Sequence, residues 1–233
     1  MTIAIIAATK LELALLLEEF QARYFDTELG CALFSARRGE RELVIVESGP
    51  GLANAAAAAA VVCMRVRPLR IFNCGVCGVY AADAALLGSV AVGIRAVFAD
   101  TGVASEEDFL SMEDIDLPLA ISAEGRDTFN VIDLDCVDVL REIQRGCFLS
   151  VAAVSGCAAH AESLKARFGA DADELVCEDM ESAAVALVAH KAGIPCTVLR
   201  GISNLCGERD YQKWKLQEAA ENAQRVLIKL LSS

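Results

Sequence analysis

The stretch Pro195-Cys196-Thr197-Val198-Leu199 is typical of a short apolar strand, and it leads into the polar run Arg200-Gly201-Ile202-Ser203-Asn204-Leu205-Cys206-Gly207-Glu208-Arg209-Asp210. The following segment, 211–231, repeats apolar residues at helical spacing. A strand, a polar run and a helix form the repeating unit of α/β proteins, which place ligand chemistry at the carboxyl ends of parallel strands. If Asn204 points into that crevice, its amide supplies hydrogen-bond donors and an acceptor but no titratable proton.

The same alternation runs through the rest of the chain, without a linker or a low-complexity segment. Strands are predicted over 2–8, 31–36, 43–47, 69–73, 89–98, 148–154, 175–177 and 195–199, and helices over 11–24, 53–66, 135–144, 161–168, 182–192 and 211–231. We therefore predict a single α/β domain over residues 1–233, a three-layer α/β/α fold around a mostly parallel, twisted mixed central sheet. Residues 100–130 are acidic and irregular, which is typical of a lid or a partner contact.

Composition restricts the class of ligand. A chain of 233 residues with 55% hydrophobic residues can bury a large core. A net charge of -12 and the lack of a Lys/Arg-rich run argue against nucleic acid or an anionic membrane as a partner. The first residues lack a basic region, and the longest alanine-rich stretch is too short to span a bilayer. These features favour a cytoplasmic protein that binds a small molecule.

Two short motifs leave alternatives open. Cys74 and Cys77 form a C-x-x-C, which is compatible with a redox or zinc site or with a tight glycine turn. The other cysteines are scattered singly, as in reduced proteins, and we expect no metal and no cofactor. The pattern Gly49-x-Gly51-x-x-Asn54 only weakly matches a dinucleotide fingerprint, so a substrate-lining loop at a helix N-terminus is the favoured interpretation.

Two groups of carboxylates follow predicted strands. Glu12 completes the T-x-x-E of a capping box, and the alternative is that it activates a water molecule. The run Glu178-Asp179-Met180-Glu181 opens a helix, where acidic residues complement the helix dipole and Asp179 can act as the cap. The dipole explains Met180-Glu181 less well, because a thioether beside a carboxylate suits a sugar ring and its hydroxyls.

Five motifs together resemble the nucleoside phosphorylase superfamily in their order and spacing. They are the strand and turn before Glu12, Ser48-Gly49-Pro50-Gly51, Asn73-Cys74-Gly75-Val76-Cys77-Gly78, Asp179-Met180-Glu181-Ser182-Ala183 and Gly201-Ile202-Ser203-Asn204. The resemblance is nearest to the hydrolase branch, which contains methylthioadenosine/S-adenosylhomocysteine nucleosidases and futalosine hydrolases. Gly207, Arg209-Asp210 and Trp214 make it most similar to the futalosine hydrolases.

The resemblance implies roles for particular residues. Glu12 would activate the attacking water, and Asn204 would stabilise the leaving purine. The implied substrate-binding residues are Val76, Cys77, Gly78, Asp179, Met180, Glu181, Ser203 and Arg209. Relatives of this kind are usually dimers, so the resemblance also implies a homodimer with segment 100–130 near the interface.

Asn204 departs from the adenine-cleaving relatives, which carry Asp at this position. A protonated Asp can donate a proton to the purine, whereas a carboxamide can only donate hydrogen bonds, for example to a ring nitrogen and a 6-oxo group. We therefore expect a 6-oxopurine nucleoside, most of all futalosine, which gives hypoxanthine in menaquinone biosynthesis. Arg209 is the candidate for the carboxylate of the 5′ group, with an ion pair to Asp210 or to the acidic segment as the alternative.

Three other functions stay open at this stage. One is a methylthioadenosine/S-adenosylhomocysteine-type nucleosidase, and another is a purine nucleoside phosphorylase, because Lys10 could contact phosphate. The third is a nucleoside-binding protein without catalytic activity, since a fold does not determine a function.

Overall fold

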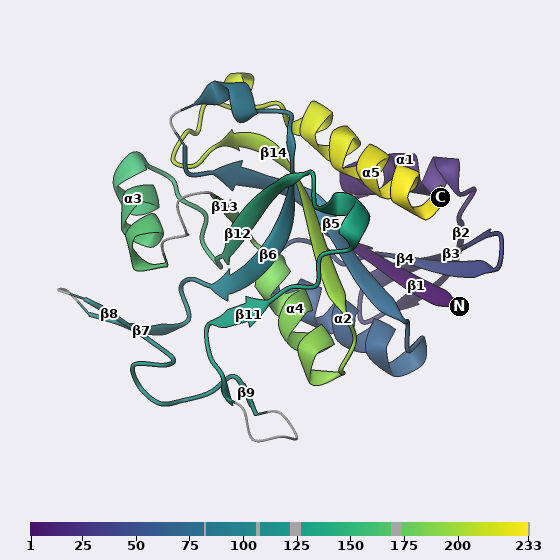
Figure 1. The fold of residues 1–233 in the computed structure, drawn as a ribbon, viewed down its shortest axis with the longest axis horizontal. Coiled ribbons are helices and arrows are strands. Elements are labelled where there is room, and N and C mark those ends of the chain that lie inside the picture. Colours follow the sequence, from purple (N-terminus) through teal and green to yellow (C-terminus); the bar gives the residue numbers. More distant parts are fainter. Residues whose placement is uncertain (82, 106–107, 122–126, 169–173, 233) are drawn as a thin grey trace.

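The computed structural model describes residues 1–81, 83–105, 108–121, 127–168 and 174–232. A ten-stranded sheet in the order β11-β6-β12-β13-β5-β1-β4-β3-β2, with β14 paired to both β5 and β6, forms its centre (Figure 1). Its strands are β1 (Thr2–Ala7), β2 (Arg23–Glu28), β3 (Cys31–Arg38), β4 (Arg41–Glu47), β5 (Arg70–Val79), β6 (Val90–Phe98), β11 (Val131–Asp133), β12 (Gln144–Ser150), β13 (Leu175–Asp179) and β14 (Cys196–Leu205).

Helices cover both faces of this sheet, as Figure 1 shows. They are α1 (Ala14–Glu19), α2 (Leu52–Arg65), α3 (Ala158–Arg167), α4 (Ser182–Lys191) and α5 (Leu216–Ser232), with 3-10 turns at Lys10–Glu12, Ala84–Leu86, Asp138–Leu140 and Tyr211–Lys213. Helices α2 and α4 share one apolar cluster with the sheet, and α1 and α5 share another. The three-layer α/β/α prediction is therefore confirmed, and the sheet is mixed because β13 and β5, for example, pair antiparallel.

Strands β5 and β14 are longer than the sequence suggested, and their extra length positions the site. The sequence patterns ended at Asn73 and Leu199, but the two strands pair in parallel as far as Val79 and Leu205. The register shifts between Ile202 and Asn204, so Ser203 is an extra residue in β14. Pairing to a neighbouring strand thus keeps the glycine-rich Asn73–Gly78 run extended, and the predicted turn at this place is wrong.

Two predicted helices are wrong over most of their length. The segment 11–24 contains only α1, because Gln21 adopts a positive φ of 49° and the chain then pairs with β3 as the strand β2. The segment 135–144 contains a single turn, since Gln144 already pairs with Ala91 of β6. In both places pairing with another strand outweighs local helix propensity.

The C-terminal helix α5 holds the segment next to Glu12. Its apolar stripe is buried against the sheet, and Gln224 in the same face is fully buried. The Gln224 amide accepts a hydrogen bond from the backbone of Leu15 at 2.8 Å and donates one to the carbonyl oxygen of Leu11 at 3.0 Å. These bonds satisfy backbone groups on both sides of the turn that carries Glu12.

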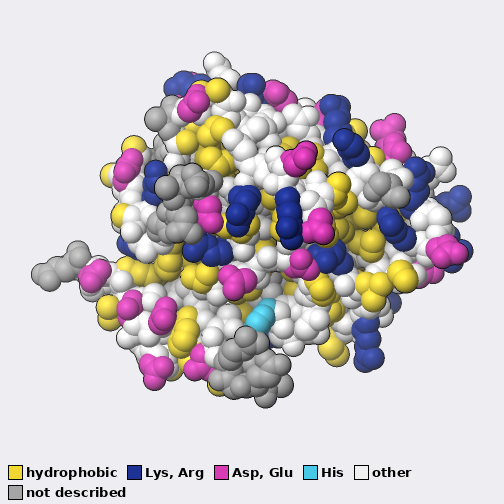
Figure 2. All heavy atoms as spheres, in the orientation of Figure 1, with side chains coloured by type: hydrophobic (Ala, Val, Ile, Leu, Met, Phe, Trp, Pro, Cys, Tyr) yellow, Lys and Arg dark blue, Asp and Glu magenta, His cyan; other side chains and the backbone are white. Residues whose placement is uncertain are grey.

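The segment between β6 and β11 projects from the sheet as two short hairpins (Figure 1). One pairs β7 (Gly102–Ala104) with β8 (Phe109–Ser111), and the other pairs β9 (Ala120–Ile121) with β10 (Asp127–Thr128). Figure 2 shows acidic and hydrophobic side chains together over this part of the surface. Residues 106–107 and 122–126 of the predicted interface segment lie outside the described residues. Among the described residues, no helix is both long enough and apolar enough to cross a membrane.

Candidate active site

Glu12 is buried at the end of β1, and its two oxygens have different partners. Oε2 accepts hydrogen bonds from the backbone N–H and the hydroxyl of Thr9, at 2.9 and 2.8 Å. Oε1 accepts one from the backbone N–H of Val76 at 3.0 Å. The capping-box and site interpretations are therefore compatible, because one oxygen closes the turn while the other faces β5.

The absence of a side chain at Gly75 makes room for this arrangement. A Cβ atom there would lie 2.6 Å from Oε1 of Glu12 and 3.3 Å from Nη1 of Arg200. Glu12 and Arg200 consequently meet above the same glycine of β5. This close approach explains why the glycine is needed.

Arg200 lies beneath the site with a 1% exposed side chain, and the sequence analysis did not identify it. Its Nε donates to Asp179 at 3.0 Å, and its terminal nitrogens donate to the carbonyl oxygen and Oδ1 of Asn73, at 3.1 and 2.5 Å. Burial works against its charged form, but the nearby carboxylates of Asp179, Glu181 and Glu12 outweigh that effect and raise the pKa of Arg200. The guanidinium is thus a fixed positive charge among three carboxylates.

Asp179 is part of this buried network. Its carboxylate accepts hydrogen bonds from the hydroxyl of Ser150 at 2.5 Å and from the hydroxyl of Ser182, the first residue of α4. Because its oxygens are occupied by Arg200 and these hydroxyls, Asp179 holds the site together and has little capacity left for a substrate. The predicted substrate-binding role therefore remains untested, and the geometry favours a positioning role.

Glu181 lies two residues after the end of β13, close enough to Glu12 to be influenced by its charge. Its Oε1 accepts a hydrogen bond from the backbone N–H of Gly51 at 2.8 Å, so the Gly49-Pro50-Gly51 loop holds the carboxylate. Gly51 adopts a φ of 94°, which favours glycine. Burial, followed by the negative charge of Asp179, raises the pKa of Glu181 to about 7. A carboxyl group with this pKa changes its charge near neutral pH.

Asn204 lies at the other end of the site, and its amide has a defined orientation. Oδ1 accepts a hydrogen bond from the hydroxyl of Ser203 at 2.7 Å, and Nδ2 donates one to the carbonyl oxygen of Leu205 at 3.0 Å. A carbonyl oxygen only accepts, so the nitrogen must face Leu205 and the amide cannot be reversed. One N–H of Asn204 is occupied in this way, and no acceptor among the described residues takes the second.

The remaining predicted site residues differ in how they reach the site. Gly78 pairs with Asn204, and a Cβ atom at Gly78 would lie 3.2 Å from Nδ2 of that residue. Val76 contributes its backbone N–H to Glu12. Met180 is half-buried between two site carboxylates. The Cys77 side chain, in contrast, packs in the apolar core. Its carbonyl oxygen lies 3.0 Å from the hydroxyl of Ser203, whose one proton it shares with Oδ1 of Asn204.

The C-x-x-C has no redox geometry. Cys74 belongs to the apolar cluster around α5, whereas Cys77 belongs to the cluster around α2 and α4 on the opposite face of the sheet. Burial raises the pKa of Cys74 to about 12. Two thiols on opposite faces of β5 cannot form a disulfide with one another.

Arg209 has no acidic partner, so the ion-pair alternative is wrong for the described residues. Its guanidinium lies over the rings of Tyr211 and Trp214, at 5.2 and 5.3 Å from their centroids, and donates to the hydroxyl of Tyr211 at 2.6 Å. Asp210 instead caps the following turn by accepting a hydrogen bond from the backbone of Gln212 at 3.1 Å. Arg209 is therefore an exposed cation beside two aromatic rings that contact one another, with 4.8 Å between their centroids.

Sequence reasoning missed three buried polar residues, namely Asn73, Ser150 and Arg200. Each lies inside a strand, where the expected residue is apolar. An arginine or an asparagine in an otherwise apolar strand was the available signal, because a buried polar group requires partners.

Comparisons with known proteins identify the family of this chain. Residues 2–232 match the family model of the phosphorylase superfamily. The chain is 25% identical over 237 residues to a 5′-methylthioadenosine/S-adenosylhomocysteine nucleosidase of Oceanobacillus iheyensis, and 99% of each chain is covered. These findings support an N-glycosyl hydrolase as the enzyme class.

Two solved structures show the same fold. The S-adenosylhomocysteine nucleosidase of Streptococcus pyogenes in complex with 5-methylthiotubericidin is 25% identical, with a TM-score of 0.78 and coverage of 100% of this chain and 96% of that one. The futalosine hydrolase of Helicobacter pylori is 22% identical, with a TM-score of 0.77 and coverage of 99% and 96%. Structures of such proteins with nucleoside analogues support a small molecule as the ligand. On the strength of the match over nearly its whole length, this chain belongs to the phosphorylase superfamily.

Proposed function

We propose that the protein hydrolyses the N-glycosidic bond of a 6-oxopurine nucleoside. The preferred substrate is futalosine, which yields hypoxanthine and dehypoxanthine futalosine in menaquinone biosynthesis. The observation that carries the proposal is the fixed amide of Asn204, which offers a donor to the base and no proton. Glu12 and Glu181, both buried, stand on the side of the sugar.

In this mechanism Glu12 accepts a proton from a water molecule as its oxygen attacks C1′. The C1′–N9 bond breaks, and its electron pair leaves with the purine. The sugar passes through an oxocarbenium-like state, and the carboxylates of Glu12 and Glu181 stabilise its positive charge. Glu181 also accepts hydrogen bonds from the ribose hydroxyls, while Met180 packs against the ring.

The departing purine carries negative charge on its ring nitrogens and on its 6-oxo group. The free N–H of Asn204 stabilises this charge by donating a hydrogen bond, and the hydroxyl of Ser203 holds the amide in place. The proton that completes hypoxanthine comes from solvent, because the amide cannot supply it. A 6-oxopurine suits this site better than adenine, which leaves less readily without an acid.

The hydrogen-bond partners of the basic residues favour hydrolysis over phosphorolysis. Arg200, the buried arginine of the site, donates to Asp179 and Asn73 and so is not available to phosphate. Lys10 is exposed on the turn that carries Glu12. A phosphate group placed at the water position would meet the carboxylate of Glu12, and the two would repel each other.

Arg209 is proposed to bind the 5′ substituent. Futalosine carries a benzoate there, and the guanidinium beside the rings of Tyr211 and Trp214 offers both charge and aromatic surface. Replacing Arg209 with Ala should raise KM for futalosine about tenfold and leave KM for inosine nearly unchanged. Equal changes for the two substrates would remove Arg209 from the 5′ site.

The test of the proposed function is incubation in phosphate-free buffer with futalosine, aminodeoxyfutalosine, inosine and methylthioadenosine, followed by identification of the released base. Hypoxanthine from futalosine without added phosphate is the expected result. A strict phosphate requirement would indicate a purine nucleoside phosphorylase instead.

The second candidate is a nucleosidase that releases adenine from methylthioadenosine or S-adenosylhomocysteine. It is favoured by the relatives of similar sequence, several of which are 5′-methylthioadenosine/S-adenosylhomocysteine nucleosidases. Release of adenine from methylthioadenosine, with no hypoxanthine from futalosine, would establish this candidate. A protein that binds hypoxanthine nucleosides but cleaves none of them would be a sensor.

The proposal includes a homodimer, formed through the hairpins between β6 and β11. Hydrophobic side chains are exposed there at Val103, Leu110, Leu117 and Ile121. An open groove of about 1110 Å³ runs between these hairpins and the ends of α3 and α4. Sedimentation velocity should give twice the chain mass for the wild type and the chain mass for Leu110→Glu. Ten free cysteines suit the reducing cytoplasm, which is the proposed location.

A further inference from the structure

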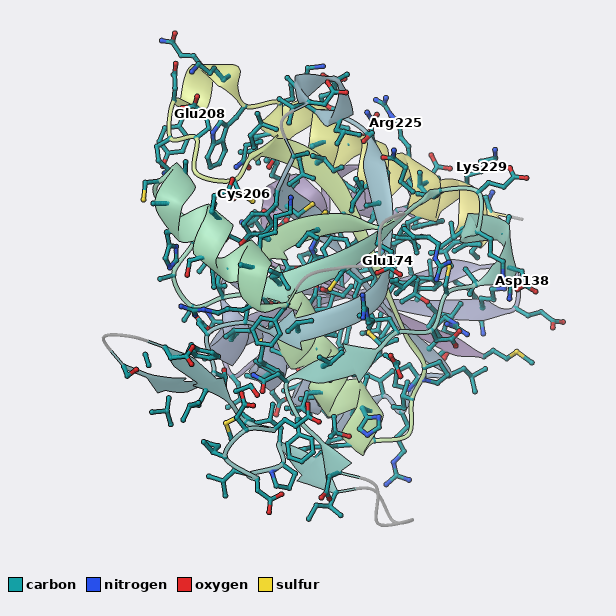
Figure 3. All side chains as sticks on the ribbon, turned by 60° about the vertical axis from the view of Figure 1, so that its left-hand side comes forward. Asp138, Glu174, Cys206, Glu208, Arg225 and Lys229 are labelled. Carbon is teal, nitrogen blue, oxygen red and sulfur yellow. The ribbon has the colours of Figure 1, made fainter. Side chains whose placement is uncertain are left out.

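Gln224 is a fully buried polar residue that the mechanism above does not use. It lies on the apolar face of α5, with the buried residues Ala220 and Leu227 one turn to either side. Exposed polar residues of the same helix, such as Arg225 and Lys229, point away from the sheet (Figure 3). A buried amide is costly unless it has hydrogen-bond partners, so the partners of Gln224 indicate what it does on this face.

Backbone groups occupy all four hydrogen-bonding positions of the Gln224 amide. Its Oε1 accepts hydrogen bonds from the N–H groups of Leu15 at 2.8 Å and Leu16 at 3.3 Å. Its Nε2 donates to the carbonyl oxygens of Leu11 at 3.0 Å and Ala220 at 2.9 Å. An amide offers two donors and two acceptor positions, so Gln224 is fully satisfied and its amide cannot be reversed.

Three of these four bonds reach the segment around Glu12. Leu11 is the middle residue of the turn that ends at Glu12. Leu15 and Leu16 are the second and third residues of α1, and N–H groups at these positions have no partner within their own helix. The residue at the N-cap of α1 is a leucine, which provides no side-chain hydrogen bond. Gln224 thus supplies from α5 the cap that the local sequence lacks.

This cap acts on Glu12 through the backbone. Only three residues separate the carbonyl group from the first N–H group that Gln224 bonds, and Glu12 is the first of the three. The carboxylate of Glu12 bonds instead to Thr9 and to the backbone of Val76. The backbone is therefore held on both sides of Glu12, while its carboxylate stays directed toward the site.

We propose that Gln224 is a positioning residue for the reaction, which holds the turn of Glu12 and so directs its carboxylate at the attacking water. The inference rests on the proposed function, from which it takes the role of Glu12. Without the amide, two N–H groups and one carbonyl oxygen of this segment would be buried without partners. The turn would shift toward other partners, and a misplacement of about 1 Å at a reacting group costs about a hundredfold in rate.

The contacts of α5 with the base end do not depend on Gln224. The backbone N–H of Lys215, just before the helix, donates to the carbonyl oxygen of Ser203 at 2.9 Å. A Cβ atom at Gly201 would overlap the carbonyl oxygen of Ala219, so the helix backbone lies directly on β14. Both contacts involve backbone atoms alone. A variant of Gln224 should therefore slow turnover and leave the binding of the base nearly intact.

The first test is Gln224→Leu, which keeps the approximate size of the side chain and removes the amide. For inosine, kcat per site should fall by about tenfold or more, whereas the Kd for hypoxanthine should stay within about twofold of wild type. Calorimetry with hypoxanthine gives both the Kd and the number of competent sites, so a loss of folded protein is not counted as a loss of rate. An unchanged kcat per site, or equal losses of binding and turnover, would overturn the proposal.

Leu231→Ala is the matched control for stability. Leu231 is buried in the apolar cluster beneath α5 and lies two turns beyond Gln224. The variant should unfold at a lower urea concentration and keep the wild-type kcat per site, because it leaves a cavity far from the turn. A comparable loss of kcat in Leu231→Ala would show that any loosening of α5 slows the reaction, and the specific role of Gln224 would be wrong.

Gln224→Glu tests the hydrogen bonds through pH, and it replaces Gln224→Leu if that variant does not fold. A protonated Glu donates to the carbonyl oxygen of Leu11, whereas an ionised Glu only accepts and would repel this oxygen. The ratio of kcat for the variant to kcat for wild type cancels the pH dependence that both proteins share. This ratio should be highest at acid pH and fall about tenfold as the buried carboxyl group ionises. A ratio that does not change with pH would overturn the proposal.

Combining Gln224→Leu with Glu12→Gln shows whether Gln224 acts through Glu12. Once residue 12 cannot accept a proton, its position matters little, so the second substitution should lower the residual kcat by less than about twofold. A full additional loss would show that Gln224 acts by another route.

The same variants separate this proposal from the proposed function. A wild type that releases no hypoxanthine from futalosine or inosine would contradict the proposed function and the role of Gln224 together. An inactive Glu12→Gln beside a Gln224→Leu with wild-type kcat would keep the proposed function and remove only the role of Gln224.

Discussion

The two ends of the site are built from different kinds of group. At the proposed sugar end, Glu12, Asp179 and Glu181 surround the buried guanidinium of Arg200, and they are held by charge, by backbone donors and by hydroxyl donors. At the base end, Asn204 is neutral and is oriented by one hydroxyl and one carbonyl. The difference suits the proposed reaction, in which positive charge develops on the sugar and negative charge on the purine. Carboxylates at one end stabilise the positive charge on the sugar. The oriented amide at the other end stabilises the negative charge on the purine at the same time.

The largest expected effect is at the sugar end. Glu12→Gln keeps the size of the side chain but cannot accept a proton, so kcat should fall by about 10²–10⁴. Hypoxanthine should still bind within a few-fold of wild type, because the base end is unchanged. Calorimetry measures the binding of hypoxanthine, which tests the base end. The rate of base release measures turnover, which tests the sugar end. A variant that loses binding and turnover equally would show that the ends are not independent.

Gly75→Ala should test the position of the Glu12 carboxylate at the same end, because it displaces this group without removing its charge. The added methyl group would lie 2.6 Å from Oε1 of Glu12, so this flexible carboxylate must move away from its place beside Val76. We expect about a hundredfold loss of kcat/KM with little loss of stability. Gly146→Ala in β12 is the control, since its Cβ would meet neighbouring atoms only at 3.4 Å or more. A fully active Gly75→Ala would contradict the role of Glu12.

Asn204→Asp should change the base end without touching the sugar end. The new carboxyl group would face the carbonyl oxygen of Leu205. Only its protonated form could donate a hydrogen bond there, as the amide of Asn204 does. A neutral Asp is also the acid that adenine requires. The ratio of adenine to hypoxanthine released from paired substrates should rise about tenfold or more, most strongly at acid pH. An unchanged ratio would show that Asn204 does not select the base.

The smallest effect is a pH dependence confined to Glu181. Because its pKa is raised to about 7, kcat/KM should increase as the pH rises through this value and the carboxylate forms. The native state binds this proton more tightly than the unfolded chain does. Stability is therefore highest below the unfolded pKa and declines as the pH rises to about 7, by roughly 1–3 kcal/mol. In Glu181→Gln, pH-rate profiles should lose the rise of kcat/KM, and urea unfolding should lose the decline of stability with pH. If either pH dependence persists in this variant, it belongs to another group.

The sequence predicted the layers of the fold and the ends of the site, but not the network that joins them. Glu12, Glu181 and Asn204 were found because each follows an apolar strand. Arg200 was overlooked because it continues such a strand, and its partner Asn73 seemed to end another. Their contacts depend on which strands become neighbours, and this long-range pairing is not encoded in local periodicity.

The extra residue at Ser203 has a consequence for how this protein can change. Deleting Ser203 from β14 would restore an unbroken ladder in which Asn204 still pairs with Gly78 and Leu205 with Val79, so the residues beyond the deletion would keep their facing. Such a chain would retain its core, because the bulge lies past the buried Val198–Ile202 part of the strand. A single deletion would therefore remove the hydroxyl beside the amide of Asn204 and leave the pairing of the strands intact.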